Sequence, residues 1–88
     1  MIRNKDFEIV TIADESMAVP VGEEAIAFHG VVALSASAAF LLNSLNEPHT
    51  ANELIEIILN EYDIDRETAE KDIKEMIPKL IELRLITE

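Results

Sequence analysis

The spacing of apolar residues changes once along this chain, and that change constrains the fold more than any other feature. Residues 7–13 alternate between two faces, with Phe7 and Ile9 on one side and Glu8 and Val10 on the other, which is the periodicity of a β-strand. From residue 36 onward the apolar residues recur every three or four positions, which is helical spacing. Strands followed by helices in one short chain predict an α+β fold.

The length of the chain limits it to one small core. A domain near 88 residues buries only about 60% of the surface that its unfolded chain exposes. One Tyr and three Phe are its aromatic residues, so Ile, Leu, Val and Ala must build most of the core. No linker or repeat divides the sequence, and we expect one domain over residues 1–88.

Three antiparallel strands are expected within residues 7–34. The first should turn at Asp14 and Glu15 into a second over residues 17–21, forming a hairpin. Pro20 cannot donate to a sheet ladder, so it should occupy an edge or a bulge. A second hairpin is expected at His29 and Gly30, with residues 25–28 as its first arm and residues 31–34 as the last strand.

The last strand has four consecutive apolar residues, 31–34. This run fits a strand buried on both faces, and it also fits a strand with one buried face and a second face covered by a ligand. The two alternatives stay open at the level of sequence.

Capping signals mark the starts of three helices. Ser35 precedes the first, Thr50 and Glu53 form a capping box for the second, and Asp65 can cap the third. Beyond the last helix, residues 85–86 should pack back onto the core as an extended tail. The three helices are expected over residues 36–45, 51–62 and 66–83, as a three-helix bundle.

The distribution of charge argues against a nucleic-acid partner. Eighteen acids face seven bases, and no Lys or Arg occurs between Asp6 and Asp65, so most of the surface should repel phosphate. The segment 66–84 has five bases and five acids and is the place where an acidic partner could approach. A winged-helix DNA-binding regulator is a weaker alternative, because its recognition helix would be neutral.

Signals for catalysis, metals and membranes are absent from the sequence. His29 and His49 lack the paired spacing of a metal site, and Ser35, Ser37 and Ser44 lack both the nucleophile elbow and an identifiable base. The longest uncharged run, residues 25–46, is interrupted by polar residues and does not predict a membrane helix. The chain has no Cys, which fits a reducing, cytoplasmic setting. We expect no enzyme activity, cofactor, metal or membrane partner.

The order of several landmarks resembles the PqqD family. These are Val-Pro-Val-Gly-Glu at residues 19–23, the segment 28–35 with its Gly-Val-Val-Ala-Leu-Ser, the Thr-Ala-Asn-Glu-Leu-Ile start of the second helix at 50–55, and the terminal Leu-Arg-Leu-Ile at 83–86. The resemblance covers residues 7–86. Two positions depart from the family pattern: Arg84 stands where many members have Gly, and Pro78 lies inside the last helix.

The resemblance implies a fold and a function. Members are similar to a winged helix-turn-helix with three strands before three helices, and they act as non-catalytic recognition elements for ribosomally made, post-translationally modified peptides. The leader of the precursor peptide would add as a strand to the last β-strand and lie beside the third helix. A separate enzyme, often a radical S-adenosylmethionine protein, would modify the core of that peptide.

The same surface could instead serve a subunit that dimerises or docks on another protein without a peptide ligand. If the chain binds a peptide as the resemblance implies, the expected peptide-binding residues are Val31, Val32, Ala33, Leu34, Ile73, Lys74, Ile77 and Ile81.

Overall fold

The three-stranded antiparallel sheet expected from the sequence is confirmed, and so is the α+β class. The computed structural model describes residues 1–27 and 30–87. In chain order its elements are β1 (Ile2–Arg3), β2 (Phe7–Ile12), β3 (Glu15–Pro20), α1 (Gly22–Ala27), β4 (Val32–Leu34), α2 (Ala36–Ser44), α3 (Ala51–Glu61), α4 (Arg66–Glu82) and β5 (Ile86–Thr87).

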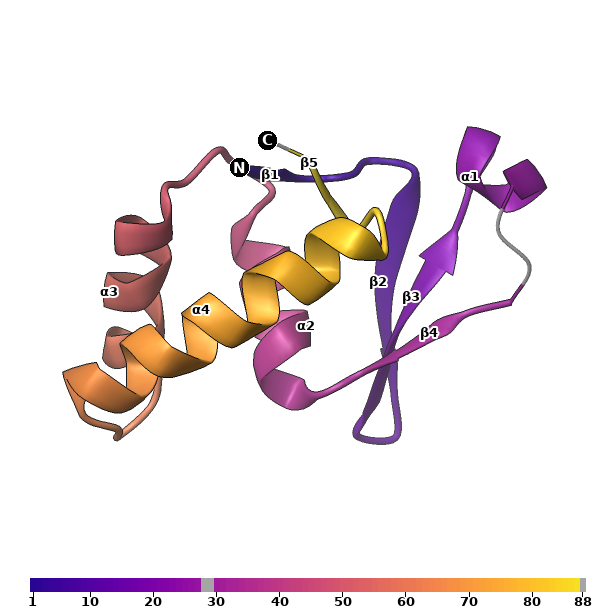
Figure 1. Cartoon of the computed structure of the whole chain (residues 1–88). Helices are drawn as coiled ribbons and strands as arrows, with labels where there is room; N and C mark the ends of the chain where they lie inside the picture. Colours follow the sequence, from indigo (N-terminus) through magenta and orange to yellow (C-terminus); the bar gives the residue numbers. More distant parts are fainter. Residues whose placement is uncertain (28–29, 88) are drawn as a thin grey trace.

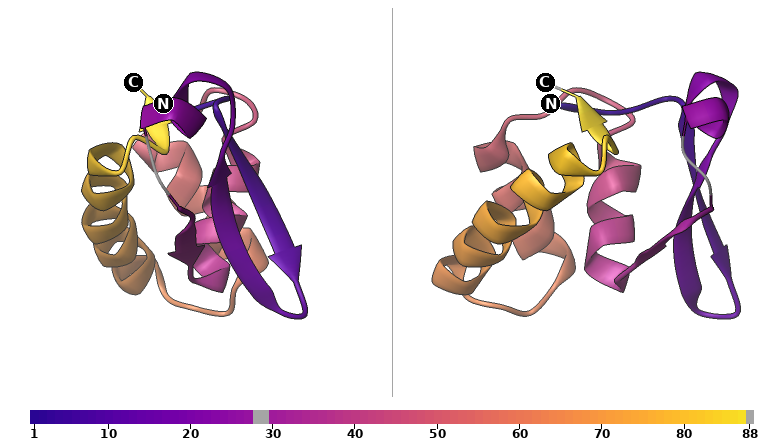
Figure 2. Two further views of the ribbon diagram at one scale, coloured as in Figure 1. Left: turned by 90° about the vertical axis from the view of Figure 1, so that its right-hand side faces the viewer. Right: turned by 45° about the vertical axis from the view of Figure 1, so that its right-hand side comes forward.

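The helices and the sheet form two layers. The strand order is β2-β3-β4, and α2, α3 and α4 all lie on one side of this sheet (Figures 1 and 2). Helix α2 is the middle element, because it contacts all three strands on one side and α3 on the other. A separate antiparallel pair, β1 with β5, joins the two ends of the chain.

The first hairpin turns one residue earlier than predicted. Ala13 and Asp14 connect Ile12 to its partner Glu15, and both have positive φ, 50° and 69°. Such two-residue turns match the twist of the strands that they join. Pro20 pairs with Phe7 at the end of β3, beyond the three residues of β3 that pair with β4. The missing amide of Pro20 therefore removes no hydrogen bond between β3 and β4.

The prediction that residues 25–28 form a strand was wrong for the described part of that segment. Gly22 has φ 58° and turns the chain out of β3 into the short helix α1. Glu23 and Glu24 occupy its first turn, where acidic side chains interact favourably with the helix dipole. The structure therefore has four helices in residues 1–27 and 30–87, one more than the three predicted. The predicted turn residue His29 lies outside the described residues.

The capping residues predicted for the three long helices are confirmed. The Ser35 hydroxyl accepts from the amide of the third residue after it at 3.2 Å, and the Asp65 carboxylate does the same at 2.7 Å. Thr50 and Glu53 form the reciprocal capping box, with distances of 3.1 and 2.8 Å. Each helix thus begins within one residue of the predicted start.

Arg84 adopts the conformation that favours glycine at this point of the chain. Its φ is 68°, and its amide donates to Ile81 O while the Leu85 amide donates to Leu80 O, both at 2.9 Å. These two bonds are the Schellman arrangement that closes helix C-termini. A non-glycine residue there costs about 1 kcal/mol. The Arg84 guanidinium also pairs with the buried carboxylate of Glu24 at 2.8 Å, a contact that glycine could not make.

The core lies between the sheet and the helices and is mainly aliphatic. The predicted tail is confirmed, since Leu85 and Ile86 are buried there. The largest fully buried side chains of the core are Phe7, Leu41, Leu42, Leu45, Leu54, Ile73 and Leu85.

The capping box should make stability depend on acid pH. The hydrogen bond from the Thr50 amide holds the pKa of Glu53 below its ordinary value, and the nearby His49 acts in the same direction. A carboxyl with a lower pKa in the folded state stabilises the fold above its unfolded pKa, and this contribution is lost as the pH falls through the folded pKa. We expect Glu53→Gln, which keeps a hydrogen-bonding side chain, to lower the melting temperature at neutral pH.

The difference between Glu53→Gln and the parent should shrink as the pH is lowered from about 7 to about 3. Thermal melts by circular dichroism at several pH values measure it. Glu47→Gln, at an exposed acid outside any helix, is the matched control. A parent-to-variant difference that stays constant across this range would show that the Glu53 charge does not contribute.

Candidate functional site

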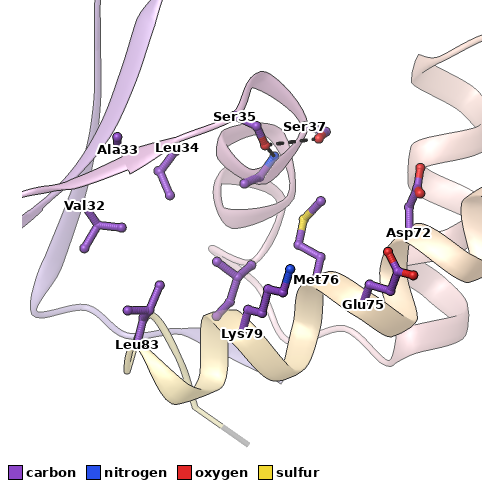
Figure 3. A pocket seen from close by; sticks show the side chains of 12 residues that line it. Val32, Ala33, Leu34, Ser35, Ser37, Asp72, Glu75, Met76, Lys79 and Leu83 are labelled. Carbon is purple, nitrogen blue, oxygen red and sulfur yellow. Dashed lines mark hydrogen bonds between the residues drawn. The ribbon is translucent and has the colours of Figure 1, made fainter.

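A groove of about 450 Å³ runs between β4 and α4. One wall is β4, the other is one face of α4, and the N-terminus of α2 closes one end (Figure 3). Its lining residues are Val32, Ala33, Leu34, Ser35, Ser37, Ala38, Asp72, Glu75, Met76, Lys79, Leu80 and Leu83.

Strand β4 lies at the edge of the sheet. One side pairs with β3, through Leu34 opposite Ser16, Ala33 opposite Met17 and Val32 opposite Ala18. The other side pairs with no strand in the described part of the chain. Such an edge offers unpaired amide and carbonyl groups to a further strand.

Successive side chains of β4 point to opposite faces of the sheet. Val32 and Leu34 point across the groove toward α4, and Ala33 points away (Figure 3). Val32 and Leu34 are half-buried and Ala33 is exposed. The alternative of a strand buried on both faces is therefore wrong, because one face borders the groove and the helices and the other is exposed.

The walls of the groove carry both apolar and polar side chains. Met76 of α4 and its C-cap residue Leu83 face the strand, with Leu83 37% exposed, and Leu80 also lines the groove. Asp72 and Glu75 lie toward α2, and Lys79 lies further along the helix (Figure 3). An extended peptide could pair with β4 through its main chain and insert alternate side chains between strand and helix.

The structure brings together only part of the predicted binding set. Val32, Ala33 and Leu34 line the groove, whereas Val31 is 56% exposed and borders a second hollow. The four predicted residues of α4 do not line the groove. Ile73 is buried, Ile77 and Ile81 are half-buried against the core, and Lys74 is exposed elsewhere on the helix.

The groove residues missed by sequence reasoning lie on the neighbouring face of the same helix. Met76, Leu80 and Leu83 belong to its apolar stripe, which is wider than the core needs. Spacing identifies such a stripe, but it does not say which part packs inward. Asp72, Glu75 and Lys79 carry no distinguishing signal in the sequence.

Residues 1–27 and 30–87 contain neither a metal-binding cluster nor a candidate membrane span. No three acidic, His or Cys side chains there gather as a metal ion would require. None of the described helices combines the length and the apolar character of a membrane span.

Comparisons with known proteins give one family and one solved structure. The model of the family described as coenzyme PQQ synthesis protein D (PqqD) matches residues 8–86. The structure of TbiB1 in complex with the TbiA(beta) leader peptide matches with a TM-score of 0.74, over 97% of this chain and 93% of that one. The identity is 22%, so this likeness concerns the fold. No curated protein matches the sequence.

Proposed function

This chain belongs to the PqqD family, and we propose that it binds the leader of a ribosomally made precursor peptide in the groove between β4 and α4. The leader adds to β4 as a further strand, and a separate modifying enzyme then acts on the rest of the peptide. The chain itself performs no chemistry and needs no cofactor for this role.

The observation that carries this proposal is the position of the free edge of β4. The unpaired edge lies next to a groove whose walls include the apolar side chains of Val32, Met76 and Leu83. In strand addition the main-chain hydrogen bonds supply affinity, and pockets for alternate side chains supply specificity. That TbiB1 was solved with a leader peptide supports a peptide ligand for the same fold here.

The charges around the groove indicate which leader would fit. Met76, Leu80 and Leu83 favour an apolar side chain opposite the middle and far end of the groove. Lys79 would attract an acidic leader residue, while Asp72 and Glu75 favour a basic or hydroxyl residue near α2. We propose a leader with a basic or hydroxyl residue near Asp72 and Glu75, an acidic residue opposite Lys79, and an apolar residue at the end of the groove beside Leu83.

The partner enzyme follows from the family. We propose a peptide-modifying enzyme, of the radical S-adenosylmethionine class in the family's common pattern, working with this chain in the cytoplasm. Nucleic acid is not a partner in this proposal, because the surface is strongly acidic, with 18 acids against 7 bases.

A pair of charge reversals on α4 tests the site. Lys79 lines the groove and Lys74 does not, yet both are exposed on the same helix. We expect Lys79→Glu to weaken binding of the leader from the precursor peptide encoded beside this chain by several-fold, about 1 kcal/mol. The loss should come mainly from slower association, and the remaining affinity should depend less on salt.

Lys74→Glu is the matched control, since it makes the same charge change outside the groove. Surface plasmon resonance at low and high salt, with thermal melts of both variants, measures the difference. Equal losses from the two reversals would place the leader elsewhere. A leader that fails to bind even the parent chain would refute the proposed function itself.

A further inference from the structure

The sheet has a second face, directed away from the helices, that the proposed function does not use. Residues directly opposite one another in a sheet share a face. The register pairs Val10 with Met17 and Met17 with Ala33, so these three form an apolar row across all three strands. We call the face that carries this row the outer face.

The outer face is uncovered. Figure 2 shows the three long helices on the opposite side of the sheet. At the hairpin end Ile12 is 61% exposed, and beside β4 Val31 is 56% exposed. On the inner face, by contrast, Phe7 and Ala18 are fully buried. Large exposed apolar side chains gathered on one face are typical of an interaction surface.

A hollow of about 320 Å³ lies between the hairpin turn and β4. Its apolar part comes from Met17, Val31, Ala33 and Leu34, and its rim carries the acids Asp14 and Glu15. A long basic side chain suits such a hollow, because its aliphatic stem can lie on apolar surface while its charged end meets the carboxylates.

The charges around the outer face have one sign. Residues 7–34 contain five acids and no Lys or Arg. Glu24 is paired with Arg84, and the ion pairs of the described residues include neither Glu8 nor Glu15. Glu8 and Glu15 stand on the outer face itself, opposite Val19 and Ile12. The apolar row therefore has an acidic rim.

We infer that the outer face is a docking surface for a protein that presents Lys or Arg side chains around an apolar patch. A second copy of this chain would bring acid against acid, and nucleic acid or an anionic membrane would be repelled in the same way. This inference rests on the proposed function, and the partner is then the modifying enzyme.

The position of β4 links the two surfaces. Its free edge and the side chains of Val32 and Leu34 border the groove, whereas Ala33 belongs to the outer face. An enzyme docked on the outer face would therefore lie beside a leader added to β4. One strand would place the peptide next to the enzyme without either partner covering the other.

A double charge reversal tests this inference. Glu8→Lys/Glu15→Lys puts two cations on the rim, while Glu47→Lys/Glu61→Lys makes the same change of net charge at exposed positions of the helical layer. The probe is the purified peptide-modifying enzyme encoded with this chain, titrated by calorimetry. We expect the first variant to weaken enzyme binding about tenfold or more, and the second by much less.

Leader binding by the same two variants separates this inference from the proposed function. Both should bind the leader as the parent does, because none of the four positions lines the groove. Equal loss of enzyme affinity in both variants, or an enzyme footprint on α3 and α4 in amide shift mapping, would overturn the docking surface while leaving leader binding intact. Loss of leader binding in the parent would refute the proposed function instead.

Discussion

Proline at one of two neighbouring positions of β4 should strongly weaken leader binding while the domain stays folded. Successive amides of a strand point to opposite edges, so Val32→Pro and Ala33→Pro remove donors on opposite sides of β4. One of these amides faces β3 and the other faces the free edge. The variant that alters the free edge loses a main-chain bond to the leader and places a ring in the path of the added strand.

We expect the free-edge variant to bind the leader about a hundredfold more weakly, since an unsatisfied main-chain partner alone costs about 1–3 kcal/mol. The other variant should lower the melting temperature, because it breaks the pairing of β4 with β3. Calorimetry with the leader and thermal melts of both proteins give the two readouts. If Val32→Pro and Ala33→Pro both fold and both bind the leader as tightly as the parent does, strand addition at β4 is ruled out.

Amide shift mapping of the parent chain provides a readout that needs no folded variant. Addition of the leader should shift the amides of β4 and of the groove face of α4, around Met76 and Lys79. Shifts confined to α3 would contradict the site whatever the proline variants do.

The features predicted correctly from the sequence are those set by residues close together in the chain. A cap needs one hydroxyl or carboxylate and the amides of the next turn, so Ser35, Thr50 and Asp65 could be identified without knowledge of the fold. Alternation over residues 7–12 likewise reports a strand with one buried face. These signals are local, and their outcome does not depend on packing.

Helix α1 was missed because its stabilising contacts are distant in sequence. Glu24 is buried against the Arg84 guanidinium, 60 positions later in the chain. Without that partner, the apolar residues after Glu24 look like the arm of a hairpin. The position of Arg84 at the helix terminus could be recognised from the family pattern. Its contact with Glu24 could not, because the two residues meet only in the folded chain.

The four residues predicted on α4 lie on the helix that borders the groove, but they do not line the groove. Ile73 faces the core and Met76 faces β4, although both belong to one apolar stripe. The core-facing and groove-facing sides of α4 differ by a rotation of less than one helical turn. The spacing of apolar residues does not show which side faces the core. Only the packing of α4 against α3 and the tail determines it.

A single kind of substitution at two positions should separate folding from binding. Leu42 is fully buried in α2, and Leu83 is 37% exposed in the groove. Leu42→Ala leaves a cavity in the helix that contacts all three strands, and a large-to-small change at such a site costs about 2–5 kcal/mol. In a domain of this size that corresponds to a fall of the melting temperature of roughly 10 °C or more.

Leu83→Ala removes the same atoms from a partly exposed wall, so it should cost little stability. It should instead weaken leader binding by about tenfold to a hundredfold, as the loss of an apolar anchor in an interface does. Ile26→Ala, at a side chain that is 79% exposed outside the groove, controls for loss of apolar surface. If Leu83→Ala bound the leader as tightly as Ile26→Ala does, the apolar wall of α4 would not contact the peptide, since the groove would have lost its most accessible leucine without effect.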